Sequence, residues 1–292
     1  MRQWLKDIAT WTVKDTLYLS IVFTWDLPRA REVALKSNKK VVAGGPAVKL
    51  MPDYLSDVAE VQDSTIYPAL AFHNPLATFT TRGCPNKCAF CAVPNTEGDL
   101  VELWTWPVLP VVCDNNLLAA SDGHFNRVIK SLKVLPYVDF NQGLDARLFN
   151  EYHARKVAEL RAAKVRFAFD HISQEVELVR SVELAKAHGL NDLGVYVLIG
   201  YEETPDDAFY RLETVRGLGV RPNPMRYRPL YALSKDDYFP SAWVHYFGSQ
   251  ARAEIELLRY MQYYSKLRYV EHVPFEDYKY RDDERNQIEL FV

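Results

Sequence analysis

Three cysteines lie within eight residues of one another, Cys84, Cys88 and Cys91, with the spacing C-x3-C-x2-C. Three thiolates this close together can bind three irons of a cubane cluster and leave the fourth iron without a protein ligand. An open coordination position is what makes a metal site reactive. The alternative is zinc, which typically needs a second cysteine pair, and the remaining cysteine, Cys113, stands alone in an apolar run. The spacing therefore favours an iron–sulfur cluster.

The elements that must position this motif form a regular alternation from residue 76 onward. Apolar, strand-like runs are expected at 76–80, 108–113, 137–140, 165–169, 193–199 and 225–229. Helices are expected between most of them, at 122–132, 151–163, 174–188 and 205–218. Strands joined by helical crossovers imply a parallel α/β sheet, and six units fall short of the eight in a closed barrel. We therefore expect an open, partial barrel, with the cysteines in a loop after its first strand.

Two further segments flank this region. The strands Thr16–Phe23 and Lys40–Ala43 surround an expected helix at Leu27–Ser37, which makes a short β–α–β unit. Its second strand runs into a Gly44-Gly45-Pro46 turn, where a backbone can approach a ligand or another element closely. The chain after residue 233 is expected to be helical at Gln250–Ser265 and then irregular and charged. The predicted domains are residues 1–75, 76–232 and 233–292.

The segment from Gly83-Cys84-Pro85 to Cys91, with the aromatic Phe90 before its last cysteine, resembles the signature of radical S-adenosylmethionine enzymes. The resemblance covers about residues 76–230. It implies a partial (β/α)6 barrel and a [4Fe–4S] cluster whose open iron is chelated by S-adenosylmethionine. The cluster would cleave S-adenosylmethionine to a 5′-deoxyadenosyl radical that abstracts hydrogen from a substrate. It also implies an external one-electron donor of the flavodoxin or ferredoxin type.

The resemblance assigns cofactor contacts to polar residues at the carboxyl ends of the strands, where ligands of parallel sheets bind. A turn after the second strand is similar to the one that family members use near the methionine amino group, and its alternative role is helix capping. An acid after the fourth strand would face the ribose, and a glycine turn after the fifth would pack near the adenine. The cofactor-binding residues predicted in this way are Phe90, Asp114, Asn115, Asn116, Gln142, Asp170, Gly200 and Tyr201.

Four charged residues are candidates for substrate binding. Asp145 and Arg147 follow the third strand, although they can equally pair with each other. Arg226 and Arg228 alternate in the sixth expected strand and so share a face, which binds a carboxylate or phosphate if it points inward and is a solvated edge if it points outward. Cys113 is either an inert buried residue or a catalytic thiol that donates a hydrogen atom or sulfur to the reaction.

The N-terminal segment is weakly similar to the cobalamin-binding domain of one radical subfamily. It lacks the Asp-x-His-x-x-Gly motif that supplies the cobalt ligand, so cobalamin is not expected, and the segment is interpreted as a remnant that caps the barrel or helps dimerisation. The stretch Cys84–Gly98 is also similar to the methylthiotransferases that modify tRNA. Those enzymes carry an N-terminal domain with three further cysteines and a C-terminal RNA-binding module, and neither is found in this sequence.

Composition narrows the remaining choices. A net charge of −3 gives no overall attraction to nucleic acid, although a local basic groove is compatible with it. No apolar run reaches the length of a membrane span, and the first residues do not resemble a secretory signal, so a cytoplasmic protein is expected. The aromatic region Tyr227–Tyr280 either stacks on substrate bases or packs as a helical cap. The expected function is a radical enzyme acting on a small molecule, nucleotide or nucleobase; the alternatives are a non-catalytic iron–sulfur protein for electron transfer or sensing, or a methylthiotransferase-like enzyme that modifies tRNA.

Overall fold

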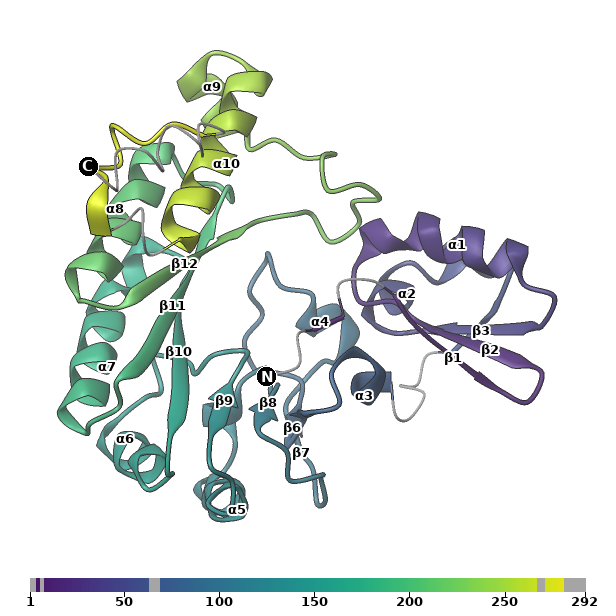
Figure 1. Cartoon of the computed structure of the whole chain (residues 1–292), viewed down its shortest axis with the longest axis horizontal. Helices are drawn as coiled ribbons and strands as arrows, with labels where there is room; N and C mark the ends of the chain where they lie inside the picture. The colour runs from purple at the N-terminus through teal and green to yellow at the C-terminus, as the bar shows by residue number, and fades with distance from the viewer. Residues whose placement is uncertain (1–3, 6–7, 63–68, 267–270, 281–292) are drawn as a thin grey trace. The chain divides into compact units, whose positions relative to one another are not determined.

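The computed structural model describes residues 4–5, 8–62, 69–266 and 271–280 (Figure 1). The chain divides into two compact units. The first takes residues 1–135 and 228–238, and the second takes residues 136–227 and 239–292. The expected N-terminal segment, 1–75, belongs to the first unit, whereas the expected cap, 233–292, contributes to both. Residues 1–3, 6–7, 63–68, 267–270 and 281–292 lie outside the described residues, and they include part of the tail after Ser265 that is predicted to be irregular and charged.

The first unit begins with a four-stranded sheet in the order β1-β2-β3-β4. Its strands are β1 (Ala9–Val13), β2 (Thr16–Ser20), β3 (Lys40–Gly44) and β4 (Glu60–Val61). β1 and β2 form an antiparallel hairpin, while β2, β3 and β4 are parallel neighbours. Helix α1 (Leu27–Lys36) connects β2 to β3. The predicted β–α–β unit is confirmed, and the hairpin strand β1 was not predicted.

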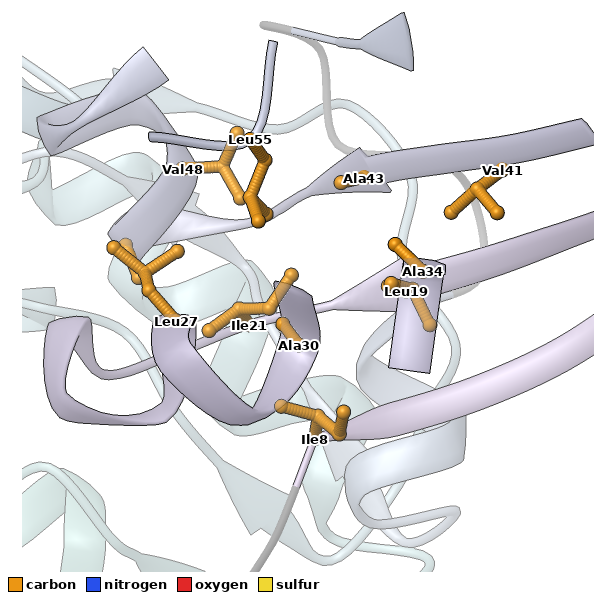
Figure 2. Packing of buried hydrophobic residues seen from close by; sticks show 11 residues of the cluster. Ile8, Leu19, Ile21, Leu27, Ala30, Ala34, Val41, Ala43, Val48 and Leu55 are labelled. Carbon is orange, nitrogen blue, oxygen red and sulfur yellow. The ribbon is translucent and has the colours of Figure 1, made fainter. Parts of the chain in front are cut away.

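The core of this sheet is built by side chains from α1 and the parallel strands. Leu27 and Ala30 of α1 and Ile21 after β2 are fully buried, and Figure 2 shows them side by side. Gly45 has a φ of 105°, and a Cβ there would lie 2.5 Å from the carbonyl oxygen of Ile21. The glycine turn therefore serves the close approach of another element, which was one of the two predicted roles.

The remainder of the first unit holds short elements. Its helices and 3-10 turns are η1 (Thr24–Asp26), α2 (Pro46–Leu50), η2 (Pro52–Tyr54), α3 (Ala69–His73), α4 (Val93–Thr96), η3 (Leu117–Ala119) and α5 (Asp122–Leu132). Its strands are β5 (Ala77–Thr78), β6 (Thr81–Arg82), β7 (Val101–Glu102) and β8 (Val111–Val112). β5 is parallel to β8, and β6 is antiparallel to β7. The expected strands 76–80 and 108–113 are thus much shorter than predicted, whereas helix 122–132 is found as predicted.

The second unit holds four parallel strands in the order β9-β10-β11-β12. They are β9 (Val138–Phe140), β10 (Ala163–Phe169), β11 (Asp192–Ile199) and β12 (Arg221–Arg226). The helical elements are α6 (Glu151–Ala158), η4 (Ile172–Gln174), α7 (Glu175–Ala187), α8 (Pro205–Gly217), α9 (Ser241–Phe247) and α10 (Gln250–Ser265). The last strand begins four residues before the predicted 225–229. The sequence does not indicate this earlier start, because Pro222 and Pro224 are unusual in a strand. An edge strand tolerates proline, which lacks an N–H group.

The two faces of this sheet differ. Helices α7, α8 and α10 pack on the strands, and Figure 1 shows α6, α7 and α8 on one side of β10 and β11. Phe167 and Val195 on that side are fully buried. The opposite face, which we name the open face, carries residues that are at least partly exposed: Lys164, Arg166, Ala168, Tyr196, Leu198, Asn223 and Met225. The chain is a mixed α/β protein with parallel sheets, and one face of the second unit's sheet carries partly exposed charged, aromatic and apolar residues.

Several aromatic residues of the C-terminal region are part of the core. Tyr260, Tyr263 and Tyr264 of α10 are buried, and their rings surround Phe275 with centroid separations of 4.7, 5.1 and 5.7 Å. The Tyr264 hydroxyl donates to Glu213 of α8 at 2.7 Å. These buried rings pack helix α10 onto the unit, and the Tyr264 contact places it beside α8. None of the helices in the described part of the chain has the length and apolar character that a bilayer span requires.

Candidate functional site

The cysteine motif lies in a closed loop of the first unit. The loop starts after β6 at Gly83 and is closed by the Cys84 N–H, which donates to the carbonyl of Gly98 at 3.0 Å. Gly83 has a φ of 73°, and a Cβ there would lie 2.1 Å from the carbonyl oxygen of Asp99. Only glycine fits this point, because both the backbone conformation and the space exclude a side chain.

Two N–H groups point at the sulfur of the first cysteine. The backbone N–H of Asn86 lies 3.4 Å from Cys84 Sγ, and the side-chain amide of Asn116 lies 3.6 Å from it. Both groups are placed to donate hydrogen bonds to this sulfur. Hydrogen bonds to the sulfurs also set the potential of iron–sulfur clusters.

The donor set fits an iron–sulfur cluster in its chemistry. Cys84, Cys88 and Cys91 are thiols on one loop and are all partly exposed, which leaves their sulfurs accessible. Among the described residues, no three His, Cys, Asp or Glu side chains are gathered tightly enough to hold a metal ion. Binding a cluster would therefore require the three thiols to move closer together. Phe90, the aromatic residue that precedes Cys91 in the motif, is half-buried.

Glu97 holds this loop and was not singled out from the sequence. Its carboxylate accepts the backbone N–H of Gly83 at 3.0 Å and the side-chain amide of Asn115 at 2.7 Å. It also forms an ion pair of 2.8 Å with Arg82. The sequence offers one signal, an acid directly before Gly98 in a short segment that follows the motif. Its partners come from two other segments, so only the fold brings them together.

Asp114, predicted near the methionine amino group, is buried against its own unit. Its carboxylate accepts the backbone N–H groups of Thr80 and Thr81 at 2.5 and 2.9 Å, and the Thr80 hydroxyl also donates to it. Burial raises the pKa of Asp114 to about 6, against the effect of these hydrogen bonds. These contacts tie the end of β8 to the β5–β6 connection, and they are not the helix cap that was the predicted alternative, since the turn at Leu117–Ala119 has no side-chain cap. The side-chain amide of Asn115 binds Glu97, and that of Asn116 lies against the Cys84 sulfur.

Cys113 lies in an apolar cluster with Ala77 and Val111, and only 1% of its surface is exposed. Its thiol donates to the carbonyl of Val111 at 3.7 Å. This environment favours the inert reading of Cys113 over a catalytic one.

The strand ends of the second unit carry the remaining cofactor candidates. Gln142 is exposed after β9. Asp170 follows β10 at a position that continues the open face, and its backbone N–H donates to Gln174 at 2.9 Å. Burial raises the pKa of Asp170 to about 6, although the nearby guanidinium groups of Arg211 and Arg147 oppose this shift. A desolvated carboxylate at a strand end is a functional-site candidate.

The glycine turn after β11 is held internally. Glu203 accepts the backbone N–H groups of Gly200 and Tyr201 at 2.5 and 2.9 Å. Arg211 of α8, 1% exposed, lies 3.8 Å from Glu203 and donates to the carbonyl of Phe169 at 2.7 Å. The amide groups of this turn are therefore occupied by the chain itself. Sequence reasoning missed Arg211, because a helical arginine gives no sign that it is buried.

Asp145 and Arg147 form an ion pair with each other, which was the predicted alternative to substrate binding. The Arg147 guanidinium donates to both carboxylate oxygens of Asp145 at 2.8 Å. Arg147 remains exposed at the carboxyl end of the sheet.

Arg226 and Arg228, predicted to share one face of the sixth strand, do not share a face. Arg226 ends β12, is 3% exposed at its side chain, and forms a two-pronged ion pair with Glu254 of α10. Arg228 lies beyond the strand, in the segment of the first unit, where it donates to the carbonyl of Lys235 at 3.3 Å and lies 5.6 Å from the Trp25 ring. The prediction was wrong because strand alternation ends at Arg226.

Comparison with protein-family models gives no match, and comparison with the curated proteins finds no sequence significantly similar to this chain.

Proposed function

We propose that the chain is a radical S-adenosylmethionine enzyme that holds a [4Fe–4S] cluster on Cys84, Cys88 and Cys91. The observation that carries the proposal is a closed loop with three partly exposed thiols, in which two N–H groups lie against the sulfur of Cys84. Three soft donors in one loop leave one corner of a cubane for another ligand. This donor set matches the family signature noted in the sequence.

The open face of the second unit supports a partial (β/α)6 barrel. Parallel sheets are normally covered on both faces by apolar residues, so a face that carries partly exposed charged and aromatic residues needs a reason. Arg166 pairs there with Asp139 and lies 5.8 Å from the ring of Tyr196. Interior faces of barrels that enclose ligands carry such polar groups. We therefore assign the open face to the barrel interior, where substrate binds.

When bound, the cluster and S-adenosylmethionine supply the 5′-deoxyadenosyl radical that abstracts a hydrogen atom from the substrate. The chain contributes binding and shielding. Asn86 and Asn116 donate hydrogen bonds to the Cys84 sulfur, and Asp170 offers a carboxylate to the hydroxyl groups of a ribose. An external flavodoxin- or ferredoxin-type donor is part of the proposal, and the substrate class remains a small molecule, nucleotide or nucleobase.

The proposal is tested by anaerobic reconstitution with iron and sulfide. We expect about four irons per chain and a broad absorption in the visible region. On reduction, S-adenosylmethionine should be converted to 5′-deoxyadenosine. Cys84→Ser, Cys88→Ser and Cys91→Ser should each abolish all three signals. Cys113→Ser is the matched control and should keep them. A protein that binds zinc or no metal contradicts the proposal, and a fully loaded protein that leaves S-adenosylmethionine intact favours the non-catalytic alternative.

A further inference from the structure

Glu97 connects three segments that the cysteine loop brings together. It follows α4, the short helix after the last cysteine. Its carboxylate reaches the end of β6 through Arg82 and Gly83, and it reaches the segment after β8 through Asn115. One side chain therefore joins the start of the loop, the end of the loop and a neighbouring strand end.

Two of these contacts lead directly to the first cysteine. Gly83, whose N–H donates to Glu97, is the residue before Cys84. Asn115, whose amide donates to the same oxygen, is the residue before Asn116, and the Asn116 amide lies 3.6 Å from Cys84 Sγ. Glu97 thus fixes the backbone on one side of Cys84 and the sulfur's hydrogen-bond donor on the other.

The negative charge of Glu97 is compensated by the adjacent guanidinium of Arg82. Its side chain is only 15% exposed, and the paired guanidinium of Arg82 is 28% exposed and lies 3.8 Å from the centre of the Phe79 ring. Two N–H donors and a cation converge on one carboxylate, which is the arrangement that makes charge-assisted hydrogen bonds strong. A shorter or neutral side chain cannot satisfy all three partners together.

We infer that Glu97 is the positioning residue of the cysteine loop. It holds the loop closed and keeps the Asn116 amide against Cys84, so that the cluster is assembled in one arrangement. The part of this inference that concerns the cluster rests on the proposed function, whereas the part that concerns the loop does not.

The test compares Glu97→Ala and Glu97→Gln with Glu102→Gln in the whole chain. Glu102 is a matched control, because it also accepts a backbone N–H, that of Ser121 at 2.6 Å, outside the cysteine loop. Hydrogen exchange of the metal-free protein reports the Gly83 and Cys84 amides. Electron paramagnetic resonance of the reduced, reconstituted protein reports the surroundings of the cluster.

In Glu97→Ala, we expect the Gly83 amide to exchange about tenfold faster or more, because a charge-assisted hydrogen bond is lost. Glu97→Gln, which keeps one acceptor oxygen of the right length, should be intermediate, and Glu102→Gln should leave Gly83 unchanged. Iron loading should fall and the resonance spectrum should change in the same order. Wild-type exchange in Glu97→Ala, or faster exchange with a wild-type cluster spectrum, would overturn the inference. If the wild-type chain binds no cluster, the proposed function fails, and exchange alone decides whether Glu97 holds the loop.

Discussion

Arg226 and Glu254 meet through two parallel hydrogen bonds of 2.6 and 2.7 Å, which join the end of β12 to helix α10. The guanidinium side chain is 3% exposed and the carboxylate side chain 23%. A residue that the sequence assigned to substrate is therefore already neutralised by its own unit. Its removal would leave a partly buried carboxylate without its cation, which is costly.

We expect Arg226→Ala to lower the free energy of unfolding by about 3 kcal/mol. Arg228→Ala is the control, since it loses a hydrogen bond to a backbone carbonyl and a contact with the Trp25 ring at an exposed site, and it should cost about 1 kcal/mol. Urea denaturation measures both. If Arg226→Ala kept full stability and yet lost substrate turnover, Arg226 would be a substrate ligand after all.

The cysteine loop should tolerate a methyl group at one of its glycines and not at the other. Gly83 and Gly98 have similar φ values, 73° and 75°, but a Cβ at Gly83 would collide with Asp99, whereas a Cβ at Gly98 meets nothing within 4 Å. Gly98→Ala should cost about 1 kcal/mol of stability and keep iron binding. Gly83→Ala should cost more and lose iron binding, measured as iron per chain after reconstitution. Equal iron content in the two variants would show that the closure at Gly83 is irrelevant to the metal site.

Cys113 should contribute to packing and not to chemistry. In Cys113→Ala we expect the free energy of unfolding to fall by about 1 kcal/mol, because a small buried side chain is truncated in an apolar cluster. Iron content and the yield of 5′-deoxyadenosine should stay at wild-type values. Loss of product with a full complement of iron would instead make Cys113 a reacting thiol.

Asp114 should make stability depend on pH. Its pKa is raised from 3.8 to about 6 in the folded protein, so the folded state keeps a proton that the unfolded state releases. This contribution is fully present below pH 3.8 and is lost as the pH rises toward 6, with a total of about 3 kcal/mol. Asp114→Asn lacks this titration. The stability of the variant relative to wild type should therefore increase between pH 4 and pH 7 in urea denaturation, and a difference independent of pH would contradict the raised pKa.

Local signals predicted much of the fold. Helix α8 begins as expected at Thr204, whose side chain accepts the Asp207 N–H in a capping box. Helix α5 follows a Ser121 cap and presents its apolar residues with helical spacing. Both depend on residues close together in the chain, which is why a sequence reveals them.

The roles of single polar residues were harder to predict, because they depend on partners far away in the chain. Asp114 binds Thr80 and Thr81, more than thirty residues before it, and Arg211 reaches Phe169, 42 residues before it. The three cysteines were recognisable because their chemistry needs only one another. The predicted strand ends indicated where polar side chains gather. They did not indicate which of these side chains bind other residues of the chain and which remain available to a ligand.

The inserted segment 228–238 has a consequence for the order in which the protein is made. Thr24 donates to the carbonyl of Ala232 at 2.7 Å, and Leu233 packs on the core of the first sheet. Residues 1–135 are synthesised first, and translation of residues 136–227 then takes on the order of 5 to 20 s. During that interval the part of the first core that Leu233 covers is exposed. Segment 228–238 can pack on the first unit only after the four parallel strands of the second unit have been synthesised.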